Sequence, residues 1–385
     1  MNYRTEVKKI EFNFLKNYYQ YSLQKEGGEE GSRSGQGRRL FAAENKEYKY
    51  LLDNEVIDFG AELLQKGEIV AFPTETVYGL GADATRGDAV KKIFAAKGRP
   101  VDNPLIVHIS EKDQLNRVVE GVLPSGADGL MEKFWPGPLT LILNCGQDIA
   151  DTVTAGLETV AVRMPRHPVA RALITVSGLP LAAPSANSSG FPSPTRAEHV
   201  LQDLEGLIQL VIDGGPCPVG VESTVVDLTA ASPEILRPGG VPREEIEVAL
   251  GRQVSVNVSG EEKDRPSSPG MKYRHYAPQT PVYLFAAGDL AAAKKIREDN
   301  LEKKIVFVLT AETAEKVANL PGVGVRILAE REDLETAARR LFWLLRELDE
   351  EDYDLVAVEA VPRHGLGEAI MNRLHKAAHN DIYLK

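Results

Sequence analysis

Cysteine is scarce in this chain: its 385 residues include two, Cys145 and Cys217, which lie far apart and form no Cys-x-x-Cys pair. So few thiols argue against a disulfide framework or a zinc cage, and they fit a reducing cytoplasm. No uninterrupted apolar run is long enough to span a membrane. The first residues lead into charge rather than into the apolar core of a signal peptide. We therefore expect a cytoplasmic protein with no membrane association.

Excess positive charge is also lacking, because the net charge is −11. That balance argues against a protein that coats nucleic acid non-specifically. It leaves room for a local basic cleft, which the fold could build from five scattered cations. These are Lys97, Arg99, Arg163, Arg166 and Arg237.

The length of the chain predicts two or three domains, and we divide it into residues 1–50, 51–250, 251–280 and 281–385. In the first part, residues 5–14 alternate as a strand does. The Gly-, Ser-, Glu- and Arg-rich stretch that follows has the composition of a linker or a disordered segment. We interpret this part as an N-terminal strand and a flexible insertion, and the alternative is an arm that touches RNA or a partner.

The second part alternates between helices and strands. Asp53 is the predicted N-cap of a first helix, whose apolar stripe ends at Gly67. The later apolar runs are rich in Val, Ile and Leu with little alternation, as in strands covered on both faces. They predict an α/β or mixed α+β fold around one large twisted sheet. The predicted strands are 68–72, 105–109, 139–143, 159–163, 181–183, 210–213 and 224–228, and the next predicted helices are 87–96 and 127–134.

Residues 251–280 break this pattern with polar, Ser- and Pro-containing sequence. Aromatic and cationic residues cluster at 271–278, which is unusual for a simple spacer, so we expect a linker that docks on another part of the molecule. A second alternation follows, with an amphipathic helix at 334–348. It predicts a smaller, separate α/β domain with strands at 282–285, 305–309, 323–328 and 355–359.

The most informative stretch is 73–81, which follows a predicted strand and precedes a helix that ends in Lys97-Gly98-Arg99. It combines Thr hydroxyls, a Gly-rich bend and two cations, an inventory that suits a small polar substrate beside a phosphate. Its glycines match the dinucleotide fingerprint in form, but they lie too far beyond the predicted strand end for that site. No Walker A sequence occurs, so ATP would need another phosphate cradle.

Each candidate has a plainer alternative. Lys97 and Arg99 could be solvated cations at a helix C-terminus, where they suit the helix dipole. His108 could be an ordinary half-buried strand residue, and the small residues of 183–190 could serve a turn instead of a ligand. Several predicted strands end in such polar loops, which favours a site at one edge of the sheet.

A pair of histidines, His375 and His379, has the i, i+4 spacing of zinc proteases. Lys376 stands where those enzymes need Glu, so we interpret this stretch as a solvated helix face. We assign no catalytic group to residues 281–385.

Eight motifs in order carry a resemblance to a known family. They are PTETVYGLG (73–81), KGR with NPLIVHI (97–109), FWPGPLT (134–140), VAVRMP (160–165), APSANSSG (183–190), ESTVVD (222–227), ILRPGG (235–240) and KYRHYAP (272–278). Together they resemble the signatures of the YrdC-domain L-threonylcarbamoyladenylate synthases. The linker and the C-terminal domain, which ends in GEAIMNRLHKAAHN, resemble the long, two-domain form of that enzyme.

The resemblance implies an enzyme that combines L-threonine, bicarbonate or CO2, and ATP into threonylcarbamoyl-AMP and pyrophosphate, with Mg²⁺ as a cofactor. The threonine amine would take up CO2, and the carbamate would then attack the α-phosphorus, so positioning and electrostatics should dominate. A separate transferase machinery would move the threonylcarbamoyl group to an adenosine in tRNA. The implied fold is a twisted open YrdC-like sheet with a concave cavity, a linker that acts as a lid, and a smaller Rossmann-like C-terminal domain.

Carried over motif by motif, the resemblance implies two groups of site residues, of which Lys97 and Arg99 would also be catalytic. The threonine-binding group is Thr76, His108, Arg163, Ala183 (through its backbone) and Ser223. The ATP-binding group is Lys97, Arg99, Asn103, Thr159, Ser185, Ser193, Arg237 and, from the linker, Tyr276, with His275 as a further helper.

One departure and two rival functions stand beside this interpretation. The family runs from its first strand almost directly into the helix at Asp53, whereas roughly 40 extra residues intervene here, so the place of the first strand is open. One rival is RNA binding by a YrdC-like cavity, which the acidic balance disfavours. The other is carbamoyl transfer to another acceptor, as in hydrogenase-maturation proteins, whose zinc modules two cysteines cannot build.

Overall fold

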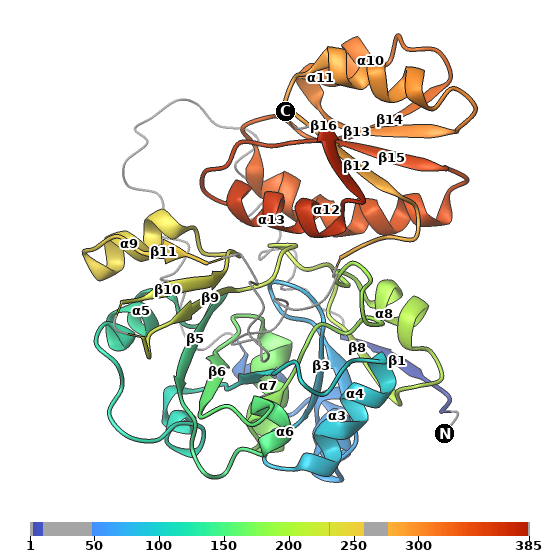
Figure 1. The fold of residues 1–385 in the computed structure, drawn as a ribbon. Helices are drawn as coiled ribbons and strands as arrows, with labels where there is room; N and C mark the ends of the chain where they lie inside the picture. Colours follow the sequence, from blue (N-terminus) through green and yellow to red (C-terminus); the bar gives the residue numbers. More distant parts are fainter. Residues whose placement is uncertain (1–2, 11–47, 231, 258–275, 384–385) are drawn as a thin grey trace.

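The computed structural model describes residues 3–10, 48–230, 232–257 and 276–383, which form two β-sheets flanked by helices. We call the described residues up to 257 the N-terminal domain and those from 276 the C-terminal domain. Figure 1 shows the C-terminal domain stacked on the N-terminal domain. The predicted insertion, most of the predicted linker and lid, and His275 lie outside the described residues.

The N-terminal domain is built on one large sheet, with the strand order β1-β8-β2-β3-β7-β4-β6-β5-β9-β10-β11. Its strands pair in both parallel and antiparallel directions, and most are buried on both faces. This confirms the predicted mixed α/β fold around one open sheet. The strands are β1 (Glu6–Lys9), β2 (Val70–Phe72), β3 (Gly79–Asp83), β4 (Ile106–His108), β5 (Leu139–Asn144), β6 (Thr159–Arg163), β7 (Leu181–Ala182), β8 (Leu210–Asp213), β9 (Thr224–Asp227), β10 (Glu234–Arg237) and β11 (Ser255–Val256).

Helices cover both faces of this sheet, and two hydrophobic clusters lie beneath them. The predicted N-cap at Asp53 is wrong by one residue: Asn54 adjoins the first helix, and its side chain accepts hydrogen bonds from the N–H groups of Val56 and Ile57. The helices are α3 (Glu55–Gln65), α4 (Gly87–Lys97), α5 (Ala127–Phe134), α6 (Asp151–Thr154), α7 (Pro168–Ser177), α8 (Ala197–Leu204) and α9 (Arg243–Leu250), with 3-10 turns η2 (Lys49–Leu51) and η3 (Lys112–Arg117).

The Gly-rich bend predicted at Gly79 to Gly81 is wrong, because these residues open strand β3, which pairs antiparallel with β2. A Cβ on Gly81 would lie 2.7 Å from the ring of Phe72 on that neighbouring strand. The glycine therefore makes room for an aromatic side chain, and the polar turn comprises the residues just before it.

Strand β1 occupies one end of the sheet, where it pairs in parallel with β8. It is shorter than predicted within the described residues. Ile10 behind it and Tyr48 are both buried in the same hydrophobic cluster. Ile10 and Tyr48 therefore meet in one core, which gives the first strand its place at the end of the sheet.

The C-terminal domain has five parallel strands in the order β14-β13-β15-β12-β16. In Figure 1, α10 and α11 cover one face, and α12 and α13 cover the other. Helix α13 ends at Ala377, so the predicted two-histidine helix face is wrong: His379 lies beyond the helix. The elements are β12 (Val282–Phe285), α10 (Leu290–Asp299), β13 (Ile305–Thr310), α11 (Ala311–Val317), β14 (Val323–Ala329), α12 (Leu334–Glu350), β15 (Leu355–Glu359), α13 (Gly367–Ala377) and β16 (Asn380–Tyr383).

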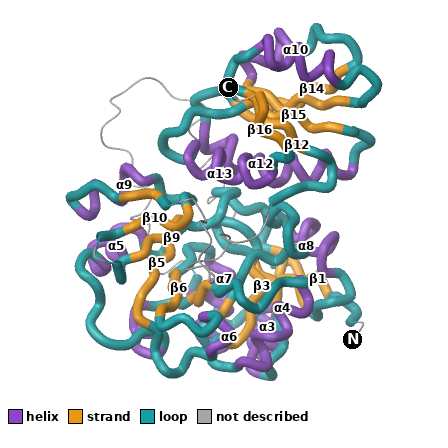
Figure 2. Tube along the Cα trace, in the orientation of Figure 1, coloured by secondary structure: helices purple, strands orange, loops and turns teal. Residues whose placement is uncertain are grey.

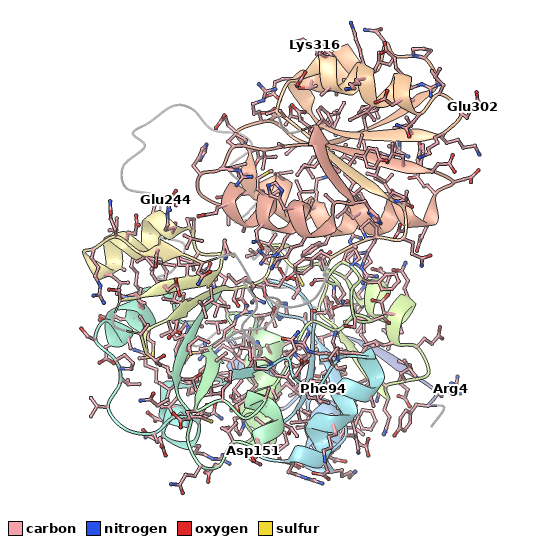
Figure 3. The ribbon with its side chains drawn as sticks, in the orientation of Figure 1. Arg4, Phe94, Asp151, Glu244, Glu302 and Lys316 are labelled. Carbon is pink, nitrogen blue, oxygen red and sulfur yellow. The ribbon has the colours of Figure 1, made fainter. Side chains whose placement is uncertain are left out.

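Helices α12 and α13 lie between their own sheet and the N-terminal domain (Figure 2). Val77 and Val221 of the N-terminal domain belong to the same hydrophobic cluster as these helices. Gly220 has a φ of +79°, and a Cβ there would lie 2.4 Å from the Cα of Arg339 on α12. The two domains therefore touch at backbone distance, and side chains fill the space between them (Figure 3). Among the residues that the structure describes, no helix combines the length and the apolar character needed to cross a bilayer.

Candidate functional site

A cavity of about 740 Å³, counted with its opening to solvent, gathers residues from segments that are far apart in the chain. Eleven of the thirteen residues predicted to bind substrate or ATP line it. They are Thr76, Lys97, Arg99, His108, Arg163, Ala183, Ser185, Ser193, Ser223, Arg237 and Tyr276.

The cavity lies over a face of the N-terminal sheet, whereas the sequence predicted an edge. Ile106 and His108 alternate onto the same side of β4, and His108 pairs with Arg163 on β6. The side chains on this face can therefore converge on one ligand.

Arg163 is held in place by a carboxylate that the sequence analysis left out. Its Nη2 donates to Glu75 Oε1 at 2.6 Å, and its Nη1 donates to Thr76 Oγ1 at 2.8 Å. Thr74 Oγ1 lies 2.8 Å from Thr76 Oγ1 and accepts hydrogen bonds from two backbone N–H groups of the turn. The acid inside the motif Pro-Thr-Glu-Thr is the signal that could have identified Glu75.

His108 is buried against the edge of the Phe72 ring. Its Nδ1 lies 3.2 Å from the carbonyl oxygen of Ile106. Burial, with the nearby positive charge of Arg163, lowers the pKa of His108 to about 3. The imidazole is therefore neutral at pH 7 and can take part in hydrogen bonding without adding charge.

Ser223 and Arg237 form a second polar group of the cavity wall. Ser223 Oγ lies 2.7 Å from Thr140 Oγ1 and accepts a hydrogen bond from Arg237 Nη2 at 3.0 Å. Arg237 Nε donates to the carbonyl of the same serine at 3.1 Å. Ala183, across the cavity, donates its N–H to Ile106, so a ligand could use its carbonyl but not its N–H.

Lys97 ends helix α4, and Gly98 follows in the left-handed conformation that turns the chain. Its ammonium donates to the carbonyl oxygens of Ser185, at 2.5 Å, and of Asn187. Burial, and then repulsion by Arg99, lowers the pKa of Lys97 well below its usual value. A side chain only 4% exposed is not a solvated cation, so the plainer alternative for Lys97 is wrong.

Two predicted ATP-binding residues do not line the cavity. Thr159 starts β6 opposite Asn144, at the other end of the strand from Arg163, so the structure does not bring it to the cavity wall. Asn103 is fully buried, and neither polar atom of its side chain has a hydrogen-bond partner among the described residues. Its carbonyl accepts a hydrogen bond from Arg99 at 3.4 Å, which places it next to the cavity.

Tyr276 reaches the cavity from the start of the C-terminal domain. Its φ of +67° is unusual for a residue with a side chain. The ring stacks on Phe342 of α12 with centroids 5.3 Å apart, and the next residue, Ala277, donates its N–H to Gly190. The C-terminal domain thus contributes Tyr276 to the lining of the cavity.

Glu222 and Arg373 were not predicted as site residues. Glu222 lines the cavity, where it accepts hydrogen bonds from Ser193 Oγ at 2.5 Å and from Arg373 Nε at 2.8 Å. Burial raises the pKa of Glu222, but the charges of Arg373 and Arg237 outweigh this and hold the pKa at about 2. An arginine on an amphipathic helix normally reads as solvated, so the sequence held no signal for Arg373.

The described residues include no cluster of three or more His, Cys, Asp or Glu side chains that could hold a metal ion. Glu222 is a cavity carboxylate, and both its oxygens accept protein hydrogen bonds. Magnesium usually needs carboxylates and keeps several waters. This lining therefore does not fit a magnesium ion held by the protein.

Comparison with known proteins shows the family of this chain. Residues 62–239 match the Sua5, YciO and YrdC family model, described as telomere recombination, and residues 241–379 match the C-terminal domain of threonylcarbamoyl-AMP synthase. The chain is 51% identical to a threonylcarbamoyl-AMP synthase of Bacillus subtilis, over 83% of this chain and 91% of that protein. It is 46% identical to the protein of that name in Pyrococcus abyssi, over 84% and 94%. The crystal structure of P. abyssi Sua5 complexed with L-threonine superposes with a TM-score of 0.77 at 45% identity, covering 84% of this chain and 94% of that one.

Proposed function

This chain belongs to the threonylcarbamoyl-AMP synthase family, and we propose that its cavity joins L-threonine, bicarbonate and ATP into threonylcarbamoyl-AMP and pyrophosphate. Membership makes it an enzyme of the nucleotidyl-transfer type with ATP as a substrate. The observation that carries the proposal is the joint placement of a buried Arg163 and of Lys97 and Arg99 around one cavity.

The threonine end is assigned to Thr76, His108, Arg163, Ala183 and Ser223. Arg163 donates one hydrogen bond from each Nη to Thr76 and Glu75, and each Nη carries a second N–H. Those two donors can hold the threonine carboxylate side by side. A relative of known structure binds L-threonine, which supports this assignment.

The nucleotide end is assigned to Lys97, Arg99, Ser185, Ser193, Arg237 and Tyr276, with the buried amide of Asn103 beside them. Lys97 contacts neutral oxygen atoms in the described structure. Among the described residues, Asp203 attracts this ammonium only from beyond hydrogen-bond distance, so the phosphates of ATP can become its direct anionic partners.

In the proposed reaction, bicarbonate takes up a proton and loses water to give CO2. The threonine amine then forms an N–C bond to the carbon of CO2 and loses a proton, which gives a carbamate. A carbamate oxygen then bonds to the α-phosphorus of ATP, and the bond to the β-phosphate oxygen breaks to release pyrophosphate. The protein holds the two reactants in line, and Lys97 and Arg99 stabilise the charge on the phosphates. Mg²⁺ belongs with the ATP phosphates, and we assign it no step.

The product is a mixed anhydride that water can hydrolyse, so we expect a transferase machinery for tRNA modification to consume it. The part of the chain that carries the proposed chemistry is residues 51–250. The C-terminal domain contributes Tyr276 and, through Arg373, a contact to Glu222.

The test is pyrophosphate release from ATP with and without L-threonine and bicarbonate, with the product identified by mass spectrometry. Release that requires both co-substrates and yields threonylcarbamoyl-AMP is the expected result. Folded protein that releases no pyrophosphate in response to threonine would overturn the proposal.

A further inference from the structure

Helix α13 of the C-terminal domain inserts Arg373 into the N-terminal domain. The side chain of Arg373 is completely buried. Its Nε donates to Glu222 Oε2 at 2.8 Å, and its Nη1 donates to the carbonyl of Pro238 at 2.9 Å. One arginine thus joins two segments, one on either side of Arg237.

Glu222 lies at the wall of the cavity with both oxygens engaged. Ser193 Oγ donates to its Oε1 at 2.5 Å, and Arg373 occupies its Oε2. Without Arg373, the Oε2 atom would be a buried charged acceptor that has lost its donor. Leaving such a group unpaired is costly, so it would turn to another cation.

The cation at hand is Arg237, which attracts Glu222 electrostatically. Two of its nitrogens, Nε and Nη2, donate to Ser223, and its Nη1 has no hydrogen-bond partner among the described residues. That nitrogen is the one left for a ligand. An ion pair with Glu222 would compete with the phosphates for Arg237.

We propose that Arg373 is a positioning residue of the synthase: it holds the Glu222 carboxylate toward the C-terminal domain and so keeps Arg237 available to ATP. The inference rests on the proposed role of Arg237. Arg373 also donates a hydrogen bond to the carbonyl of Pro238, the residue after Arg237. That bond fixes the backbone from which Arg237 reaches the cavity. Through Arg373, which does not itself contact ATP, the C-terminal domain therefore affects the affinity for ATP.

The test separates this role from that of a merely structural ion pair by removing the negative charge of Glu222, which Arg373 holds in place. Steady-state pyrophosphate release would be measured for R373Q, E222Q, the double variant R373Q/E222Q, and R237Q. We expect R373Q to raise the KM for ATP about tenfold while the KM for threonine changes less than about twofold. Adding E222Q should return the ATP KM to within about threefold of the unmodified chain, because no carboxylate is left to capture Arg237.

Arg346 offers a matched control at the same interface. It is also buried, and it donates to Asp203 at 2.7 Å and to the carbonyl of Pro192 at 2.6 Å. E222Q should not restore any activity that R346Q loses, because Glu222 is not its partner. Restoration of both arginine variants alike would overturn the proposal.

Two other outcomes distinguish the proposed role of Arg237 from that of Arg373. If R237Q leaves the ATP KM unchanged, Arg237 does not bind ATP, and the assignment beneath the inference fails. If R237Q impairs ATP binding but E222Q does not rescue R373Q, the role of Arg373 fails alone. Circular dichroism melts check that each variant folds. If R373Q does not fold, R373K replaces it, and because lysine keeps the positive charge, adding E222Q to R373K should leave the KM for ATP unchanged. A higher KM for ATP in R373K/E222Q than in R373K would count against the proposal.

Discussion

The two sheets of this molecule both collect polar groups from several strands, but they use them in opposite ways. The N-terminal sheet surrounds a cavity in which Lys97 contacts only neutral oxygen atoms among the described residues. At the carboxyl edge of the C-terminal sheet, a buried carboxylate of the protein itself accepts the hydrogen bonds of the donors that gather there. The first arrangement leaves cationic charge for a ligand, whereas in the second Glu359 pairs with the nearby cation Arg331.

That carboxylate belongs to Glu359, at the end of β15, which is 1% exposed. Its Oε2 accepts from the N–H of Thr310 at 2.8 Å, and its Oε1 accepts from the N–H of Gly288 at 2.7 Å. The hydroxyl of Thr313 and the guanidinium of Arg331 also donate to Oε1. The carboxyl edge of parallel strands is the usual place for a ligand, so donors at that edge do not make a site when an internal acceptor occupies them.

The largest effect is expected from removing Lys97, the cation that contacts only neutral oxygen atoms among the described residues. Lys97→Met should lower threonine-dependent pyrophosphate release by about 10²–10³-fold, as for other groups that stabilise transition-state charge. Because burial and Arg99 already disfavour its charged form, the variant should unfold at the same temperature or higher. Kinetics and a thermal melt measure the two effects.

Lys316→Ala is the matched control, since this exposed lysine lies at the far end of the C-terminal domain, as labelled in Figure 3. It should change neither quantity. Full activity of Lys97→Met would remove this residue from the chemistry.

Removing the buried carboxylate of Glu359 should lower stability and leave activity nearly unchanged. Glu359→Gln replaces a charged acceptor of several hydrogen bonds, and we expect it to lower the free energy of unfolding by about 2–3 kcal/mol. Activity should stay within about twofold at temperatures where the variant is folded. Urea unfolding followed by tryptophan fluorescence would measure the loss, because Trp343 lies on α12 of the same domain. A variant that is stable yet inactive would show that this edge takes part in function.

Local sequence predicted the elements well because their cause is local. Strand 159–163 and helix 127–134 have the bounds predicted, since an apolar run or an amphipathic stripe needs no distant partner to be recognised. The bend at Gly79 to Gly81 was wrong because the need for glycine comes from the ring of Phe72 on another strand.

The candidate site shows the same division. The motifs of the family resemblance led to most of the cavity lining, but they did not lead to Glu222 of that lining or to Glu75, which holds Arg163. Glu75 and Glu222 act by holding arginines that are distant in sequence, Arg163 and Arg373. The first pair forms only when the N-terminal domain folds and the second only when the two domains pack, so neither spacing nor composition could predict which arginine each acid holds.

Low pH tests the stability of the N-terminal domain alone, through the buried side chain of His167. Its Nδ1 accepts the N–H of Val169 as the N-cap of α7, which requires an unprotonated nitrogen. Burial lowers the pKa of His167 from 6.5 to about 4. Between these two pH values the unfolded state binds the proton and the folded state does not. The stabilisation by neutral His167 is therefore complete above pH 6.5 and is lost as the pH falls toward 4. This one residue should contribute about 1.4 kcal/mol per pH unit in that window. His167→Asn keeps a good N-cap but cannot titrate, so its unfolding free energy should fall less steeply between pH 6.5 and 4. Parallel curves for the two proteins in urea titrations would show that His167 is not the group that acid reaches.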